Sequence, residues 1–160
     1  MPDHDATAID LLYADDLHVG DNFDLGTHHV TLEEIVEFAS RWDPQGFHID
    51  EATAAAGMFG GIIASGIHSM AIFQRLAVTA QYDRWAVIAG RTLEDVQLLS
   101  PVRPDMTLRG RIRIEAVEPR GACRALVHQA CSLLHDDVVV LSYRGSVYVR
   151  TRPANDDVTP

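Results

Sequence analysis

Apolar and polar residues alternate with two different periods along the chain. In residues 31–80 the apolar residues recur at the three- and four-residue spacing of helices, whereas in residues 85–150 they alternate with polar residues. The alternation is clearest in TLRGRIRIEA, residues 107–116, where one face is apolar and the other carries arginine. The earlier part of the chain therefore predicts helices, and the later part predicts half-buried strands.

Three helices are expected in the helical part. Thr31-Leu-Glu-Glu34 has the pattern of a capping box, so a helix begins there and ends near Trp42. Residues 43–47 then form a loop, because a proline follows Asp43 and disfavours helical geometry in the residue before it. Asp50 can cap a brief alanine-rich helix, and Ser65 can cap a longer one over GIHSMAIFQRLAVTA. The last helix is apolar nearly all round, which predicts that it is buried.

Strands are expected near residues 23–30, 85–99, 107–116, 122–135 and 138–150. Turn signals separate the later strands, which predicts an antiparallel meander. A long antiparallel sheet and a very apolar helix bury each other's apolar surfaces when the sheet curls around the helix. The predicted fold class is α+β, with a curved antiparallel sheet wrapped around a long central helix, which is the hot dog arrangement.

The size and charge of the chain limit its organisation and its partners. At 160 residues it fits a single domain, which we place at residues 13–152 between loose polar tails at residues 1–12 and 153–160. The formal net charge of -10 disfavours nucleic acid and anionic membranes as partners, so an anionic ligand must meet a local basic patch. No apolar run is long enough to span a bilayer and no secretory signal is visible, so we expect a cytoplasmic protein. Cys123 and Cys131 lie too far apart along one predicted strand to form a disulfide, and we expect buried free thiols.

Asp43 and His48 flank the predicted turn and could act as an acid/base pair. Addition of water to an activated double bond needs one group to orient and deprotonate the water and another to manage the proton at the neighbouring carbon. A carboxylate can accept a hydrogen bond from water, and an imidazole exchanges a proton near neutral pH. Spacing alone also fits a simple turn, because an Asp before a proline is a common turn residue and a loop histidine is often only solvated.

The glycine-rich segment that precedes the long helix offers a second element for catalysis. A helix N-terminus has unpaired backbone N–H groups and a partial positive charge, so it can stabilise the enolate formed from a thioester. Gly66 is the expected donor, since it has no side chain to block close approach. The alternative is that these glycines only permit a tight turn beside the core. Apolar residues around this segment are candidates for an acyl pocket or for plain core packing: Phe47, Phe59, Ile62, Ile63 and Ile67.

The run RWDPQGFHIDEATAAAGMFGGIIASGIHSM resembles the signature of MaoC-like, R-specific enoyl-CoA hydratases and dehydratases, and AGRTLEDVQLLSPVRPDMTLRGRIRI resembles a later part of the same proteins. The positions that fall into step with the signature are Asp43, Phe47, His48, Asp50, Ala64 and Gly66. The resemblance implies a hot dog fold and reversible hydration of trans-2-enoyl-CoA to R-3-hydroxyacyl-CoA. It further implies Asp43 and His48 as the catalytic pair, Gly66 as the backbone donor, a homodimer, and no cofactor or metal apart from the coenzyme A of the substrate.

The sequence departs from this signature at three positions near the predicted site. Gln45 stands where asparagine is usual, and Gly46 replaces a proline whose ring would stiffen the turn, so we expect a looser pair geometry. Ser65 replaces a histidine, which we expect to affect substrate preference. His68, one helical turn further on, could line the acyl channel or could be a hydrogen-bonded helix histidine.

Two other functions remain as alternatives. An acyl-CoA thioesterase on this fold usually carries an acidic residue on the central helix, whereas residues 66–80 contain no Asp or Glu. A non-catalytic acyl-thioester-binding subunit is the other alternative, which retention of the Asp/His pair disfavours. Arg109, Arg111 and Arg113 share one face of a predicted strand and could contact the phosphates of coenzyme A, but the alternation alone explains them as a solvated face. Three other arginines are possible phosphate contacts that the sequence does not rank: Arg84, Arg91 and Arg103.

Overall fold

The computed structural model describes residues 11–153. The helices are η1 (Ala14–Asp16), α1 (Leu32–Trp42), α2 (Gly46–Ile49), α3 (Glu51–Ala56), α4 (Gly66–Ala80) and η2 (Tyr82–Arg84). The strands are β1 (Asn22–His29), β2 (Val87–Leu98), β3 (Thr107–Pro119), β4 (Arg124–His135) and β5 (Val138–Arg150). The predicted strands and the longer helices are thereby confirmed, and α4 spans the fifteen residues that the sequence pattern assigned to it.

The strands form one antiparallel sheet in the order β1-β3-β4-β5-β2. Strands β3, β4 and β5 follow one another as a meander, joined by tight turns. Strand β2 lies outside this meander, because it pairs with β5 at the edge of the sheet opposite β1. The connection from β2 to β3 contains Pro101 and Pro104, and it crosses the end of the sheet instead of closing a hairpin.

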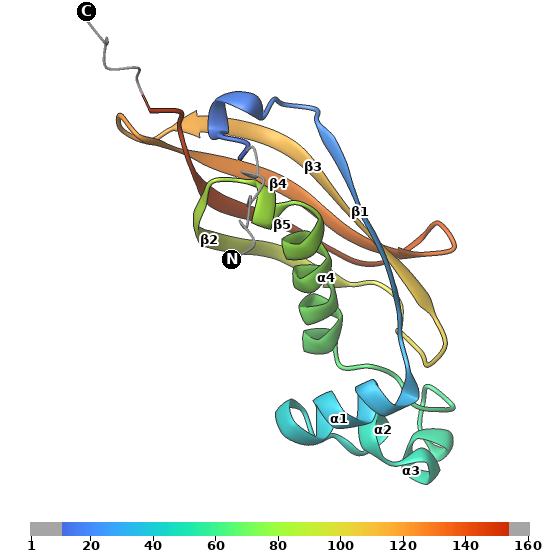
Figure 1. Ribbon diagram of the computed structural model, residues 1–160. Helices are drawn as coiled ribbons and strands as arrows, with labels where there is room; N and C mark the ends of the chain where they lie inside the picture. The colour runs from blue at the N-terminus through green and yellow to red at the C-terminus, as the bar shows by residue number, and fades with distance from the viewer. Residues whose placement is uncertain (1–10, 154–160) are drawn as a thin grey trace, which may run out of the picture.

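Helix α4 lies in the concave face of the sheet, as Figure 1 shows, which is the hot dog arrangement. Phe73 on α4 is fully buried, and its ring meets that of Tyr143 on β5 edge to face at 5.1 Å. The prediction that α4 is buried holds for one side of the helix, whereas Ile67 and Gln74 are exposed. The reason is that α4 contacts mainly β1 and leaves one of its faces uncovered.

Helices α1, α2 and α3 gather beyond the N-terminal end of α4 (Figure 1). Two predicted caps are confirmed: Thr31 accepts a hydrogen bond from the Glu34 N–H at 3.1 Å, and Asp50 accepts one from the Thr53 N–H at 2.7 Å. The predicted loop over residues 43–47 is shorter than expected, because α2 begins at Gly46. A Cβ at this glycine would lie 2.8 Å from Cγ2 of Thr53, so its small size lets α2 approach α3 closely.

The predicted tails fall almost entirely outside the described residues. Leu12, which the sequence places in the N-terminal tail, exchanges backbone hydrogen bonds with Arg84 and Ala86 at 2.8 Å each. Cys131 is buried as expected, whereas Cys123 is exposed in the turn before β4, and neither forms a disulfide. Within residues 11–153, no helix is long and apolar enough to cross a membrane, and no three metal-ligating side chains are grouped to hold an ion.

Candidate active site

Asp43 and His48 approach each other at the junction of α1 and α2. Asp43 is the C-cap of α1, where its N–H donates to the Ala39 carbonyl at 2.8 Å, and His48 lies one short turn later in α2. The Asp43 Oδ2 and His48 Nε2 atoms are 3.5 Å apart. The His48 side chain is almost completely buried, while that of Asp43 is about a quarter exposed, at 24%. The two groups therefore face each other with the carboxylate toward solvent and the imidazole in the protein.

The tautomer of His48 is fixed by the backbone. Its Nδ1 atom lies 2.6 Å from the Ile63 carbonyl oxygen. A carbonyl oxygen only accepts, so Nδ1 carries the proton, and in the neutral imidazole Nε2 keeps its lone pair. The lone pair of Nε2 then faces the Asp43 carboxylate, which is also an acceptor. Two acceptors therefore face each other, and a hydrogen-bond donor placed between them could donate to both.

Two side chains hold the Asp43 carboxylate in place. Ser65 Oγ donates to Oδ2 at 2.7 Å, and Gln45 Nε2 donates to Oδ1 at 2.8 Å. These bonds, Ser65 first and Gln45 second, lower the pKa of Asp43 from its ordinary value, and the His48 charge adds to the lowering while desolvation opposes it. Asp43 is therefore a carboxylate across the neutral range. The sequence pattern named Ser65 as a helix cap and a substrate-binding candidate, and treated Gln45 as a departure from a signature. It predicted neither hydrogen bond to Asp43.

Ser65 also links the carboxylate to the start of α4. It is the N-cap of this helix, and its Oγ accepts a hydrogen bond from the Ile67 N–H at 3.2 Å. The Gly66 N–H donates to no acceptor among the described residues. One buried hydroxyl thus joins Asp43 to a helix N-terminus that has a free backbone donor next to it.

Gly66 lies beside Leu98, a proximity that the sequence did not predict. A Cβ at this position would lie 2.3 Å from Cδ1 of Leu98, at the end of the edge strand β2. The Leu98 side chain therefore occupies the space that a side chain at residue 66 would need. A side chain at residue 66 would therefore have to displace the exposed Leu98 side chain.

A cavity of about 540 Å³ contains the pair and the start of α4. Of the residues proposed from sequence, it is lined by Asp43, Phe47, His48, Phe59, Ile63, Ser65, Gly66 and Ile67. The lining residues that sequence reasoning did not propose for the site are Gln45, Ala64, Ser69, Leu98, Leu99, Ser100, Pro101, Val102 and Val140. Most of these come from the end of β2 and the following turn, which sequence pattern cannot place beside α4. The lining is mainly apolar and carries no Arg or Lys.

Two of the proposed pocket residues lie elsewhere. Ile62 is buried in the hydrophobic core and does not line the cavity. His68 stacks on Phe38 with ring centroids 4.6 Å apart, and its Nε2 lies 3.6 Å from the Glu34 carboxylate. Burial lowers the pKa of His68, partly offset by Glu34. Its side chain therefore connects α1 to α4 behind the cavity and does not line it.

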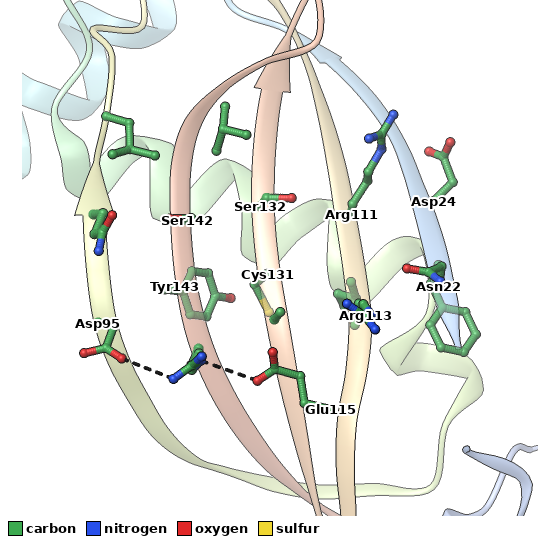
Figure 2. Close-up of a pocket in the computed structure, with 17 residues that line it drawn as sticks. Asn22, Asp24, Asp95, Arg111, Arg113, Glu115, Cys131, Ser132, Ser142 and Tyr143 are labelled. Carbon is green, nitrogen blue, oxygen red and sulfur yellow. Dashed lines mark ion pairs between the residues drawn. The ribbon is translucent and has the colours of Figure 1, made fainter. Parts of the chain in front are cut away.

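A second hollow, of about 780 Å³, lies on the outer face of the sheet, opposite α4. Figure 2 shows Arg111 and Arg113 on one side of it. Arg144, which also lines this hollow, forms ion pairs with Asp95 at 3.7 Å and with Glu115 at 3.5 Å. Asp95 and Glu115 are thus already ion-paired, and no histidine lines this hollow. The smaller cavity at the start of α4 is therefore the better candidate active site.

The fold and this cavity define a class of protein: a hot dog domain with an Asp/His pair at the N-terminus of its central helix. The sequence model of the MaoC like domain matches residues 17–130, well over half of the chain. The chain belongs to the MaoC-like domain family.

Individual proteins are also similar to this chain in sequence or in structure. An uncharacterized protein of Bacillus subtilis strain 168, YdeM, is 33% identical over 106 residues, which are 66% of this chain and 75% of YdeM. The MaoC-like dehydratase of Rhodospirillum rubrum is 36% identical, with a TM-score of 0.83 over 89% of this chain and 99% of that one. The R-hydratase PhaJ1 of Pseudomonas aeruginosa superimposes with a TM-score of 0.75 over 94% of this chain and 95% of its own, at 17% identity, and shows the shared fold.

Proposed function

We propose that the protein is a hydro-lyase that reversibly hydrates trans-2-enoyl-CoA to R-3-hydroxyacyl-CoA. The observation that carries the proposal is the arrangement of two acceptors, Asp43 Oδ2 and His48 Nε2, 3.5 Å apart on a largely apolar cavity. A water molecule has two O–H groups and can donate to both atoms at once, from a position beside the line that joins them. Family membership supports hydratase or dehydratase chemistry in the broad sense.

In the proposed reaction, the water donates one hydrogen bond to Asp43 and gives its other proton to His48 Nε2 as its oxygen bonds to C3. The electrons of the carbon–carbon double bond move toward the thioester oxygen, which becomes an enolate. The Gly66 N–H and the positive end of α4 stabilise that oxygen. The proton taken from the water is then delivered to C2 on the same face, so one H and one OH are added in total.

The test is turnover of trans-2-enoyl-CoA thioesters of short and long chains, followed by loss of the conjugated enoyl absorbance. We expect the wild type to hydrate at least one chain length. Asp43→Asn should lower the rate by about 10²–10⁴-fold, the range that a positioned acid or base contributes. Asp136→Asn, a matched change in the exposed turn between β4 and β5, should leave the rate unchanged.

His48→Gln tests the other member of the pair. Glutamine keeps an N–H donor for the Ile63 carbonyl but cannot take a proton. We expect the variant to bind the thioester and to turn it over poorly. Wild-type activity in His48→Gln would refute the acid/base assignment.

The same incubations, followed also by a thiol assay for free coenzyme A, separate the two alternative functions. Release of free coenzyme A without hydration would indicate a thioesterase, although α4 offers no Asp or Glu for such chemistry. Binding of the thioesters with neither reaction at any chain length would indicate an acyl-thioester-binding subunit. Neither alternative has a specific observation in its favour.

We further propose that the protein acts as a homodimer joined along β2. This strand is an edge of the sheet and exposes apolar side chains, among them Leu93 at 63% and Leu98 at 61%. An exposed apolar edge strand is a template for pairing with another strand. Leu98 and the exposed Ile67 also line the cavity. A second copy of the chain paired with β2 would therefore cover one side of the cavity. Light scattering after gel filtration should give a dimer for the wild type and a monomer for Leu93→Lys.

A further inference from the structure

An acyl thioester carried by phosphopantetheine brings negative charge to a chain whose net charge is already -10. The cavity itself offers no compensation, since no arginine lines it. A cation that receives the carrier must therefore lie outside the lining and beside the opening. The geometry of the connection between β2 and β3 identifies one.

Arg103 lies on that connection directly after Val102, which lines the cavity. Its Nη2 donates to the carbonyl oxygen of Phe59, another lining residue, at 2.7 Å. Its Nη1 lies 3.7 Å from where a Cβ of Gly61 would be. The guanidinium thus bridges the glycine-rich segment before α4 and the segment after β2. Of the arginines in the described residues, it is the one that hydrogen-bonds to the cavity lining.

Most N–H donors of the Arg103 guanidinium remain available for a ligand. The hydrogen bond to Phe59 uses one of its five N–H groups, and within residues 11–153 it forms no ion pair. Other arginines are already neutralised: Arg109 by Asp24, Arg120 by Glu118 and Arg144 by Asp95 and Glu115. Arg111 and Arg113 form no ion pair with any other described residue, but they border the outer hollow on the far face of the sheet.

We propose that Arg103 binds a phosphate of the carrier of the acyl thioester, an inference that rests on the proposed function. A guanidinium presents paired N–H donors that match two phosphate oxygens, and the bond to Phe59 fixes its orientation before the ligand arrives. Phosphopantetheine has a 4′-phosphate both in coenzyme A and on acyl carrier proteins, and coenzyme A adds further phosphates. The site therefore selects phosphorylated carriers over bare pantetheine.

The test compares three thioesters of one enoyl chain, carried on coenzyme A, on 4′-phosphopantetheine and on pantetheine. Arg103→Gln keeps an N–H donor for Phe59 and removes the charge. We expect kcat/KM for the coenzyme A thioester to fall about tenfold, through KM, as loss of a charge-assisted phosphate contact predicts. The pantetheine thioester should react equally with wild type and variant. A loss shared by the phosphopantetheine thioester places the contact at the 4′-phosphate, and a loss confined to coenzyme A places it at the other phosphates.

Arg113→Gln is the matched control, because it removes an unpaired arginine from the outer face of the sheet. In Arg113→Gln, kcat/KM for all three thioesters should equal that of the wild type. An equal loss of activity with all three thioesters in Arg103→Gln would overturn the proposal in favour of a structural role, and so would no loss with any of them. Arg103→Lys, which retains the charge, should recover part of the loss.

A binding measurement keeps this test separate from the proposed reaction. Titration of free coenzyme A should give a Kd about tenfold higher for Arg103→Gln than for wild type, and more so at low salt than at high salt. Equal Kd values would overturn the Arg103 proposal even if the enzyme hydrates enoyl thioesters. Failure of the wild type to hydrate any thioester, with the Kd difference intact, would overturn the hydratase proposal and leave Arg103 as a phosphate contact.

Discussion

Replacing Ser65 with alanine removes both hydrogen bonds of one buried hydroxyl. The hydroxyl donates to Asp43 at 2.7 Å and accepts from the Ile67 N–H at 3.2 Å. Loss of an N-cap costs about 1 kcal/mol, and loss of a hydrogen bond to a charged group costs about 1.5–3 kcal/mol. We therefore expect the free energy of unfolding to fall by about 3 kcal/mol and Tm by about 6–12 °C for a chain of this size.

The same substitution should change the pH dependence of catalysis. The Ser65 bond is the largest cause that lowers the pKa of Asp43, so in Ser65→Ala this pKa should rise toward its ordinary value. The carboxylate is the active form, and the acid limb of the kcat/KM profile should therefore move to higher pH. Since the folded-state pKa is lowered, the stabilisation from this bond is complete at neutral pH and is lost as the pH falls through that pKa. The difference in unfolding free energy between wild type and variant should shrink accordingly in acid.

Thr31→Ala is the matched control for this experiment. Thr31 caps α1 through a 3.1 Å bond from the Glu34 N–H and does not contact Asp43. We expect it to lose about 1 kcal/mol of stability and to keep the wild-type pH profile. Thermal unfolding and pH–rate profiles of the three proteins make the comparison. A Ser65→Ala profile with an unmoved acid limb would refute the argument that this hydroxyl controls the protonation of Asp43.

Three further substitutions test other parts of the site and core. Gln45→Leu removes the second bond to Asp43 and should shift the acid limb in the same direction by less, with Tm nearly unchanged because Gln45 is exposed. Gly66→Ala should displace the Leu98 side chain and lower kcat while the pH profile keeps its shape; unchanged kcat would argue against the Gly66 N–H as a donor. Phe73→Ala should lower the free energy of unfolding in denaturant titration by about 3–5 kcal/mol, and a cost below about 1 kcal/mol would contradict its place in the core.

The sequence by itself determined the local elements of this protein. The capping pattern before α1, Ser65 before α4 and the alternation in β3 depend on residues a few positions apart, and the structure has these elements where the patterns placed them. Asp43 and His48 were also found from sequence, because five positions of chain separate them and a short turn keeps them close.

Only the tertiary structure decided which groups act on that pair. The Ser65 hydroxyl reaches Asp43 across 22 positions of sequence, and the Ile63 carbonyl that fixes the His48 tautomer comes from 15 positions away. The placement of β2 beside β5 brings Leu98 onto Gly66, and no periodicity reports this pairing. The physical reason is that helix and strand patterns reflect interactions between near neighbours. Contacts between distant segments depend on the path of the whole chain, which the packing of α4 in the curved sheet fixes.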